Sequence, residues 1–239
     1  MSWPQGYGLA RHQSLDSTNE EARRLASKGE IGPVWITAEE QTAGRGRRGR
    51  VWESQSRNLA ATLLLRPARP QAEWPQLSFV TAIAAADMAA HFLPSAVIAV
   101  KWPNDILADG RKLSGILLES AGDGVAVGVG VNLASHPDGT EFPATSMAAF
   151  GAAPTPEDAL AALAGGFARW YDIWLADGFS PIRDAWLARA AGLGGRIRCR
   201  LATGERHGVF EGIDQTGALL LGEGMGRQSV IPAADIFFG

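Results

Sequence analysis

Residues 44–50 combine three glycines with four arginines, and Val51 and Trp52 follow directly. Glycine lets backbone amides approach a ligand closely, and an arginine guanidinium can bind both oxygens of a carboxylate or phosphate. The chain as a whole is slightly acidic, with a formal net charge of −3, so this positive charge is local. We expect this arginine loop, residues 44–57, to bind an anionic ligand.

The same glycines match other phosphate-binding patterns, and their context argues against each one. Gly44, Gly46 and Gly49 have the spacing of a dinucleotide-binding turn and of a kinase glycine-rich loop. However, no helix begins at these glycines, and no His-Arg-Asp or Asp-Phe-Gly segment follows. Gly110 and Gly115 have P-loop spacing, but Ile116 stands where the phosphate-binding lysine must be.

Further short polar segments accompany the loop in a fixed order. They are Ser17-Thr18-Asn19 and Gln41 upstream, then residues 101–105 (Lys-Trp-Pro-Asn-Asp), 111–119 (Arg-Lys-Leu-Ser-Gly-Ile-Leu-Leu-Glu) and 128–132 (Gly-Val-Gly-Val-Asn) downstream. In order and spacing, this set resembles the biotin–protein ligase family, the biotin–[acetyl-CoA-carboxylase] ligases. The resemblance covers about residues 17–132, and residues 212–221 give a weaker match.

The resemblance implies a biotin site and an adenylate site that share their charged residues. Short polar side chains can pair with the ureido ring of biotin, although Ser17 could equally be only a helix cap. The implied biotin-binding residues are Ser17, Thr18, Asn19, Gln41, Gly44, Arg45, Gly46, Arg47, Lys112, Gly115, Leu117 and Gly128. The implied adenylate-binding residues are Arg45, Arg47, Trp52, Lys112 and Asn132, with ordinary core burial as the alternative for Trp52.

Lys112 is the expected central catalytic group, together with Arg45 and Arg47. A cation between the biotin carboxylate and the α-phosphate offsets negative charge as the two react. Spacing alone would make Lys112 an exposed hairpin lysine, and the family's Lys-Leu-(Ala/Ser)-Gly segment is what assigns it to the site. Arg48 and Arg50 are expected to be solvated.

Three residues are expected to support the site. Lys101 and Asn104 would shape the turn at residues 101–105, and Asp105 would position Lys112 or the metal ion. No Cys/His spacing suggests a metal site belonging to the protein. We therefore expect Mg²⁺ to be carried by ATP.

The implied reaction has two steps. Biotin and MgATP give biotinyl-5′-AMP and pyrophosphate, and a lysine of the biotin carboxyl carrier protein of acetyl-CoA carboxylase then attacks the adenylate. About sixteen residues precede Ser17, too few for the DNA-binding domain of bifunctional family members. We therefore expect the monofunctional form, without sequence-specific DNA binding.

Two other functions are open. A lipoate or octanoate ligase or transferase of related fold would be favoured by a thiol or lysine acyl acceptor and by the absence of an arginine loop. A nucleic-acid-binding module could use the Arg/Gly loop. Against it, the chain has 25 acidic and 22 basic residues, which indicates no basic face.

Apolar patterns and turn residues predict an α+β fold, with a mixed or antiparallel sheet and flanking helices over residues 1–191. Helices are expected at residues 17–29, with a Ser17–Glu20 capping box, at 77–92, at 155–177 and from a Ser180-Pro181 cap. Strands are expected at 34–37, 59–65, 97–100, 106–107, 113–118 and 125–131. Residues 192–239 are expected to form a small SH3-like β-barrel with strands at 196–201, 209–213, 218–221 and 229–231.

The remaining features indicate a cytoplasmic protein. Cys199 is the one cysteine, which fits a reducing compartment. The N-terminus has no secretory signal pattern, and no apolar run reaches the roughly 18–20 residues of a membrane-spanning helix. The sequence leaves open whether the chain is a monomer or a homodimer.

Overall fold

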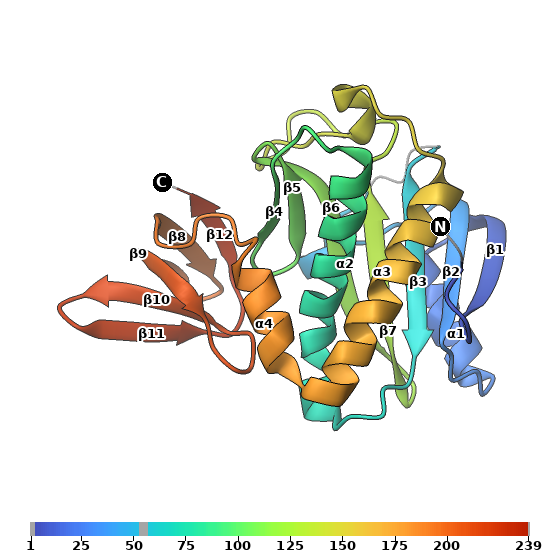
Figure 1. The fold of residues 1–239 in the computed structure, drawn as a ribbon, viewed down its shortest axis with the longest axis horizontal. Helices are drawn as coiled ribbons and strands as arrows, with labels where there is room; N and C mark the ends of the chain where they lie inside the picture. Colours follow the sequence, from blue (N-terminus) through green and yellow to red (C-terminus); the bar gives the residue numbers. More distant parts are fainter. Residues whose placement is uncertain (1–2, 53–56, 239) are drawn as a thin grey trace.

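A seven-stranded sheet with helices on both faces lies beside a smaller five-stranded sheet in the computed structural model, which describes residues 3–52 and 57–238 (Figure 1). The strand order in the large sheet is β1-β2-β3-β7-β6-β5-β4. All its neighbouring strands pair antiparallel except β1 and β2, which are parallel. The strands are β1 (Gly8–Leu15), β2 (Val34–Gln41), β3 (Leu59–Leu65), β4 (Ile98–Lys101), β5 (Asp105–Ala108), β6 (Arg111–Ala121) and β7 (Gly124–Val131).

The predicted strands are present, and two further strands were not predicted, β1 in this sheet and β12 (Asp235–Phe238) in the C-terminal module. Every residue of β3 is buried, as its continuous apolar run predicts. The additional strand β1 pairs only with β2, at the edge of the sheet, and Arg11, His12 and Gln13 interrupt its apolar pattern. An edge strand with one neighbour buries little apolar surface, so its sequence carries little periodicity.

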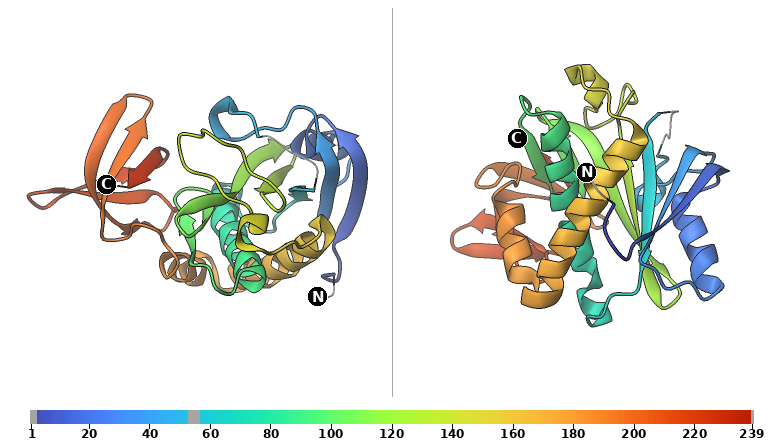
Figure 2. Two further views of the ribbon diagram at one scale, coloured as in Figure 1. Left: turned by 90° about the horizontal axis from the view of Figure 1, so that it is seen from above. Right: turned by 45° about the vertical axis from the view of Figure 1, so that its right-hand side comes forward.

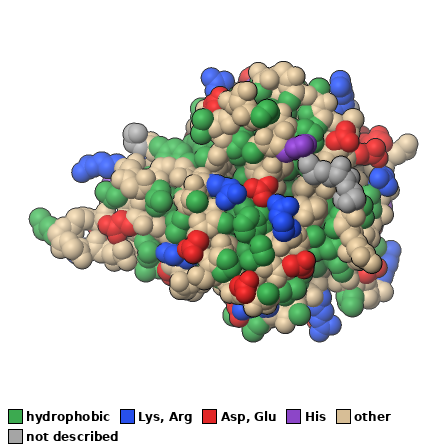
Figure 3. All heavy atoms as spheres, in the orientation of Figure 1, with side chains coloured by type: hydrophobic (Ala, Val, Ile, Leu, Met, Phe, Trp, Pro, Cys, Tyr) green, Lys and Arg blue, Asp and Glu red, His purple; other side chains and the backbone are tan. Residues whose placement is uncertain are grey.

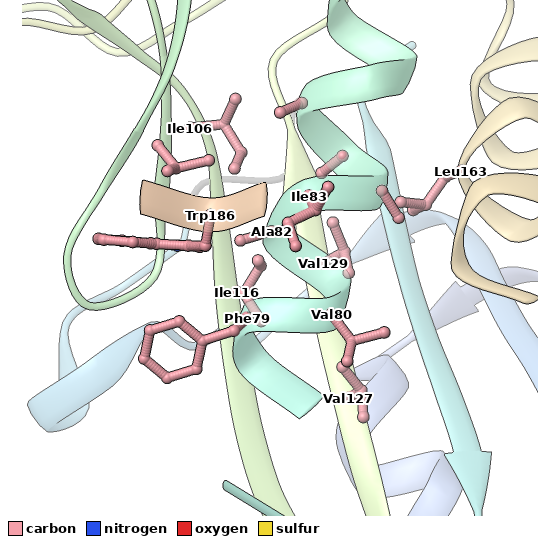
Figure 4. Close-up of a cluster of buried hydrophobic side chains, with 14 of the residues drawn as sticks. Phe79, Val80, Ala82, Ile83, Ile106, Ile116, Val127, Val129, Leu163 and Trp186 are labelled. Carbon is pink, nitrogen blue, oxygen red and sulfur yellow. The ribbon is translucent and has the colours of Figure 1, made fainter. Parts of the chain in front are cut away.

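Helices α2 (Leu77–Phe92) and α3 (Pro156–Asp177) cover one face of the large sheet, and α1 (Thr18–Ser27) covers the other (Figure 2). Figure 4 shows Val80 and Ile83 of α2 lying against Val127 and Val129 of β7. The opposite face carries a smaller apolar cluster formed by Ala22, Ile36, Leu64, Ala121 and Ala126. The α+β prediction with flanking helices is therefore confirmed.

Helix starts were predicted better than their capping contacts. Thr155 caps α3 by accepting a hydrogen bond from the Asp158 backbone N–H at 3.1 Å. Helix α1 begins after Ser17 as expected, but the Ser17 hydroxyl makes no capping hydrogen bond, so the capping-box contact is wrong. Helix α4 (Phe179–Leu187) begins one residue before Ser180. The described residues also include three short 3₁₀ helices, η1 (Arg47–Gly49), η2 (Gln71–Gln76) and η3 (Met147–Phe150).

The C-terminal module is an open antiparallel sheet, which corrects the predicted closed barrel. Its strand order is β11-β10-β9-β8-β12. The strands are β8 (Arg196–Leu201), β9 (Gly204–Ile213), β10 (Leu219–Gly224), β11 (Arg227–Ile231) and β12 (Asp235–Phe238). The short strand β12 lies against the large domain through ion pairs of Asp235, while β10 and β11 extend away from it (Figure 1). The two edge strands therefore do not pair with each other.

One apolar cluster continues from the large sheet into the C-terminal module. Trp186 of α4 packs edge-on against Phe79 of α2 and against Phe210 of β9, with ring-centroid distances of 5.5 and 6.5 Å. The Trp102 indole N–H donates to the Gly217 carbonyl at 3.0 Å. The boundary between residues 191 and 192 stays a prediction. No helix in the described part of the chain is long and apolar enough to cross a membrane.

Candidate active site

A cavity of about 340 Å³ lies where the arginine loop, the large sheet and β12 meet. Every predicted site residue lines it except Gly44, which is buried at the start of the loop and accepts a hydrogen bond at its carbonyl from the Trp52 backbone N–H at 3.0 Å. The part of the predicted loop at residues 53–56 lies outside the described residues. The topology thus brings together side chains that are more than one hundred residues apart in sequence.

Neutral polar groups line one end of the cavity. The Thr18 backbone N–H and hydroxyl both donate to Gln41 Oε1, at 2.8 and 3.0 Å. Thr62 Oγ1 lies 2.7 Å from Thr18 Oγ1 and 2.6 Å from Asn19 Oδ1. The Asn19 amide in turn donates to Glu119 Oε2 at 2.8 Å. Such a network orients short donors and acceptors; the side chains that line the cavity here carry no charge, and the Glu119 carboxylate pairs with Arg23 at 2.9 Å.

Glycines form the floor of the cavity. A Cβ atom on Gly128 would overlap the Asn19 side chain, and one on Gly130 would overlap the Trp52 ring. Gly130 pairs with Gly115 across β6 and β7, and a Cβ on Gly115 would lie 3.3 Å from the same ring. The indole of Trp52 therefore lies flat against two adjacent glycines.

Lys112 forms the central ion pair of the site. It follows the Asp109-Gly110 turn, in which both residues have positive φ. Lys112 Nζ lies 2.7 Å from Asp105 Oδ1 and 5.8 Å from the centre of the Trp52 ring. A register shift between β5 and β6 accompanies this pairing. Lys112 is thus fixed between a carboxylate and an aromatic ring at the cavity wall.

The arginine loop is held by acidic and amide partners on three elements. Arg45 contacts Glu20 of α1, and Arg47 donates to Asn104 Oδ1 at 3.3 Å. Burial lowers the pKa of Arg47, although its guanidinium keeps its charge at neutral pH. Arg48 and Arg50 were expected to be solvated, but both pair with Asp235 of β12, at 3.0 and 2.5 Å.

Asn104 and Asn132 use their amides to fix the backbone. Asn104 Nδ2 donates to the Ile116 carbonyl at 2.6 Å, and the Ile116 N–H donates back to the Asn104 carbonyl at 3.0 Å. Asn132 Nδ2 donates to the Thr145 carbonyl at 3.0 Å, and this side chain is buried. Both therefore hold the cavity walls in place.

Three residues of the site were not singled out from the sequence. Thr62 is a lone polar residue in the apolar run of β3, and Gly130 repeats Gly128 at the period of two expected for one face of a strand. Those two signals were present in the sequence. Asp235 gave no such signal, because its partners in the arginine loop, Arg48 and Arg50, lie more than 180 residues away in sequence.

Comparison with known proteins identifies the family. The model of the biotin/lipoate A/B protein ligase family matches residues 12–134, and that of the biotin protein ligase C terminal domain matches residues 192–239. This chain belongs to the biotin/lipoate A/B protein ligase family. It is similar to a biotin–[acetyl-CoA-carboxylase] ligase of Paracoccus denitrificans, at 51% identity over 94% of this chain and 98% of that protein.

More distant relatives agree with this assignment to the biotin/lipoate A/B protein ligase family. The bifunctional ligase/repressor BirA of Bacillus subtilis is 34% identical over 98% of this chain and 75% of its own length. In fold, the chain is similar to the biotin protein ligase from Aquifex aeolicus in complex with biotin and ATP, with a TM-score of 0.86. That match covers 97% of this chain and 99% of the other at 24% identity.

Proposed function

We propose that this protein is an ATP-dependent biotin–protein ligase that forms biotinyl-5′-AMP and transfers biotin to a lysine of the biotin carboxyl carrier protein of acetyl-CoA carboxylase. The observation that carries the proposal is the position of Lys112, which lies between a neutral polar pocket and the arginine loop. The close relative from Paracoccus denitrificans carries the name of this activity.

The first step is an attack of a biotin carboxylate oxygen on the α-phosphorus of ATP. Thr18, Asn19 and Gln41 would bind the ureido ring at the neutral end, and the aliphatic tail would run over Gly128 towards Lys112. Lys112 would offset charge between the carboxylate and the α-phosphate, and Asp105 would hold its ammonium group in place. Arg47 would contact the same phosphate from the loop.

The second step is attack of the carrier lysine amine on the mixed anhydride, which releases AMP. Trp52 would cover the adenylate, and Asn132 would hold the wall beside the adenine. Mg²⁺ bound to ATP would offset charge on its phosphates, and Asp105 offers an oxygen ligand of the kind that this ion prefers. Within residues 3–52 and 57–238, no group of three His, Cys, Asp or Glu residues could hold a metal ion.

The partner and location are parts of the same proposal. We infer a cytoplasmic protein that meets its carrier domain there, and one that does not read DNA sequence. On the face shown in Figure 3, lysines and arginines are interspersed with acidic residues rather than gathered in a basic patch. A homodimer is compatible with this function.

Biotin-dependent exchange between ATP and pyrophosphate tests the proposal on the purified chain. We expect exchange with biotin and none above background with lipoate or octanoate at equal concentration. Exchange driven by lipoate or octanoate instead would assign the other branch of the family. Salt-dependent retention of nucleic acid without any exchange would favour a nucleic-acid-binding module.

A further inference from the structure

Lys101 is a buried cation at the far end of the cavity from the neutral pocket. It is the last residue of β4, and its exposed fraction is 6%. Its Nζ lies 3.8 Å from the ring centre of Phe142 and about 6 Å from those of Phe237 and Phe238 of the C-terminal segment. Among the described residues, no carboxylate lies within 4.0 Å of it and none of their side chains accepts a hydrogen bond from it.

The acidic groups nearest to Lys101 are paired with other cations. Asp105 pairs with Lys112 at 2.7 Å, and Asp235 pairs with Arg50 at 2.5 Å. Burial lowers the pKa of Lys101; the charge of Asp105 opposes this only in part, and the charge of Lys112 lowers the pKa further. Burying a cation without a counter-ion costs free energy, which an anionic ligand in the cavity would offset.

The strand order places the site residues on successive strands across the sheet. Gln41 is on β2, Thr62 on β3, Gly128 on β7, Lys112 on β6, Asp105 on β5 and Lys101 on β4, at the opposite edge. In phosphoryl and nucleotidyl transfer, the attacking and leaving oxygens lie roughly in line across the phosphorus. With biotin arriving from the β2–β3 side and the α-phosphorus near Lys112, the leaving oxygen points towards β5 and β4.

We propose that Lys101 forms the subsite for the β- and γ-phosphates of ATP, which leave as pyrophosphate, with Phe142 and Phe237 forming its wall. This inference rests on the proposed function. As the biotin oxygen bonds to the α-phosphorus, the bond from that phosphorus to the bridging oxygen breaks, and its electron pair leaves with the pyrophosphate. Lys101 neutralises charge on that leaving group, and the C-terminal module supplies part of the subsite.

Lys101→Met tests this subsite, because methionine keeps the unbranched, apolar stem against Phe142 and removes the charge. We expect titration calorimetry to show about 10- to 100-fold weaker pyrophosphate binding, and KM for ATP in the exchange reaction to rise by a similar factor. Lys28→Met is the matched control, since Lys28 is exposed and lies outside the cavity. It should leave both values unchanged.

Transfer of biotin from preformed biotinyl-5′-AMP to the carrier distinguishes a phosphate-binding role of Lys101 from a purely structural role. That step involves no β- or γ-phosphate, so Lys101→Met should perform it at the wild-type rate, and Lys101→Arg should partly restore pyrophosphate binding. Equal losses in both half-reactions would make Lys101 a structural residue and overturn the proposal. So would unchanged pyrophosphate affinity in a folded Lys101→Met variant.

A measurement on the wild-type protein does not depend on the variant folding. The chain has three lysines, Lys28, Lys101 and Lys112. Acetylation followed by peptide mass spectrometry should show slower modification of Lys101 with pyrophosphate and magnesium present, with Lys28 unaffected. No protection of Lys101 at saturating pyrophosphate would contradict the subsite. Protection without any biotin-dependent exchange would support the subsite and reject the proposed ligase function.

Discussion

Lys112 and Asp105 show how a single ion pair can set the direction of a reactive group. The ammonium lies 2.7 Å from the carboxylate, and Lys112 has 28% of its side chain exposed towards the cavity. A short, partly buried pair fixes the flexible lysine stem before any substrate arrives, so its charge needs little reorganisation during the reaction. We therefore propose Asp105 as a positioning residue for Lys112.

Replacing Lys112 by alanine should nearly abolish adenylate formation while the protein stays folded. We expect the rate of biotin-dependent ATP–pyrophosphate exchange to fall about 100-fold or more, because the charge acts on the reacting atoms. Lys28→Ala is the control for loss of a lysine, and thermal unfolding checks the fold. Near-wild-type exchange in folded Lys112→Ala would remove Lys112 from the mechanism.

Gly128→Ala should weaken biotin binding selectively. The added Cβ would overlap the Asn19 side chain, so Asn19 must move and lose its contacts to Thr62 and Glu119. Loss of one or two such hydrogen bonds corresponds to about a tenfold higher Kd for biotin by titration calorimetry. The Kd for pyrophosphate should not change.

Gly165→Ala is the matched control for the glycine substitution. Gly165 lies inside α3, and a Cβ there meets nothing within 4 Å. The control should bind biotin normally and gain about 0.5–1 kcal/mol of unfolding free energy from the better helix propensity of alanine. Equal biotin affinity in Gly128→Ala and wild type would show that the ligand does not use this floor.

At the scale of the elements, local sequence patterns predicted what local physics determines. The apolar run of β3 and the helical spacing of apolar residues in α2 identify buried elements, because this periodicity can be read from residues that are close together in the sequence. The ordered polar segments resemble those of a known family, and this resemblance predicted that Lys112 and Gly128 share one site. Strand β1 and the pairing of Asp235 were not predicted. Each depends on contacts with residues that become neighbours only in the folded structure.

The arginine loop should respond to ligand as one element. Its like-charged arginines repel one another when no anion lies between them, and Glu20 and Asp235 compensate this repulsion in part. The arginine side chains of these pairs are 38–55% exposed, which screens the pairs even where the carboxylate is nearly buried, and such pairs contribute only about 0–1 kcal/mol each. We therefore still expect trypsin to cleave within residues 45–57 rapidly in the empty protein and slowly with biotin and MgATP.

The Arg47→Gly variant tests whether ordering of the arginine loop by ligand helps the enzyme to retain the adenylate. Loss of the Arg47 contacts should let biotinyl-5′-AMP escape faster and label added amines more readily, measured as biotin on a bystander protein. Arg11→Gly, on the edge strand β1, is a control for loss of an exposed arginine. Equal trypsin cleavage rates with and without ligand would reject gating by the loop and leave the ligase assignment standing.

At the scale of the whole molecule, the C-terminal sheet and the active-site loop meet at Asp235. Arg48 and Arg50 come from the loop, while Arg200 comes from β8 and lies 3.3 Å from the same carboxylate. The Asp235 side chain is only 12% exposed. A nearly buried carboxylate shared by three arginines therefore couples the position of β12 to that of the loop, and through Phe237 and Phe238 to the surroundings of Lys101.

Asp235→Asn should destabilise the protein at neutral pH and have little effect in acid. Burial alone would raise the pKa of Asp235, but the hydrogen bond and charge of Arg50 and the charge of Arg48 outweigh it and hold that pKa below its ordinary value. A carboxyl whose pKa is lowered on folding contributes stability above its unfolded pKa of about 3.9, and loses it as pH falls through the lower folded value. We expect urea unfolding to show that the free energy of unfolding of the variant is lower by about 1–2 kcal/mol at pH 7, a modest deficit because the arginine partners are themselves partly exposed. This deficit should shrink below about pH 4.

Asp123→Asn, at an exposed turn without ion pairs in the described structure, is the control and should match wild type at every pH. A deficit that stays constant from pH 7 to pH 3 would mean that Asp235 acts through its shape rather than its charge, and the electrostatic link between the two sheets would have to be abandoned.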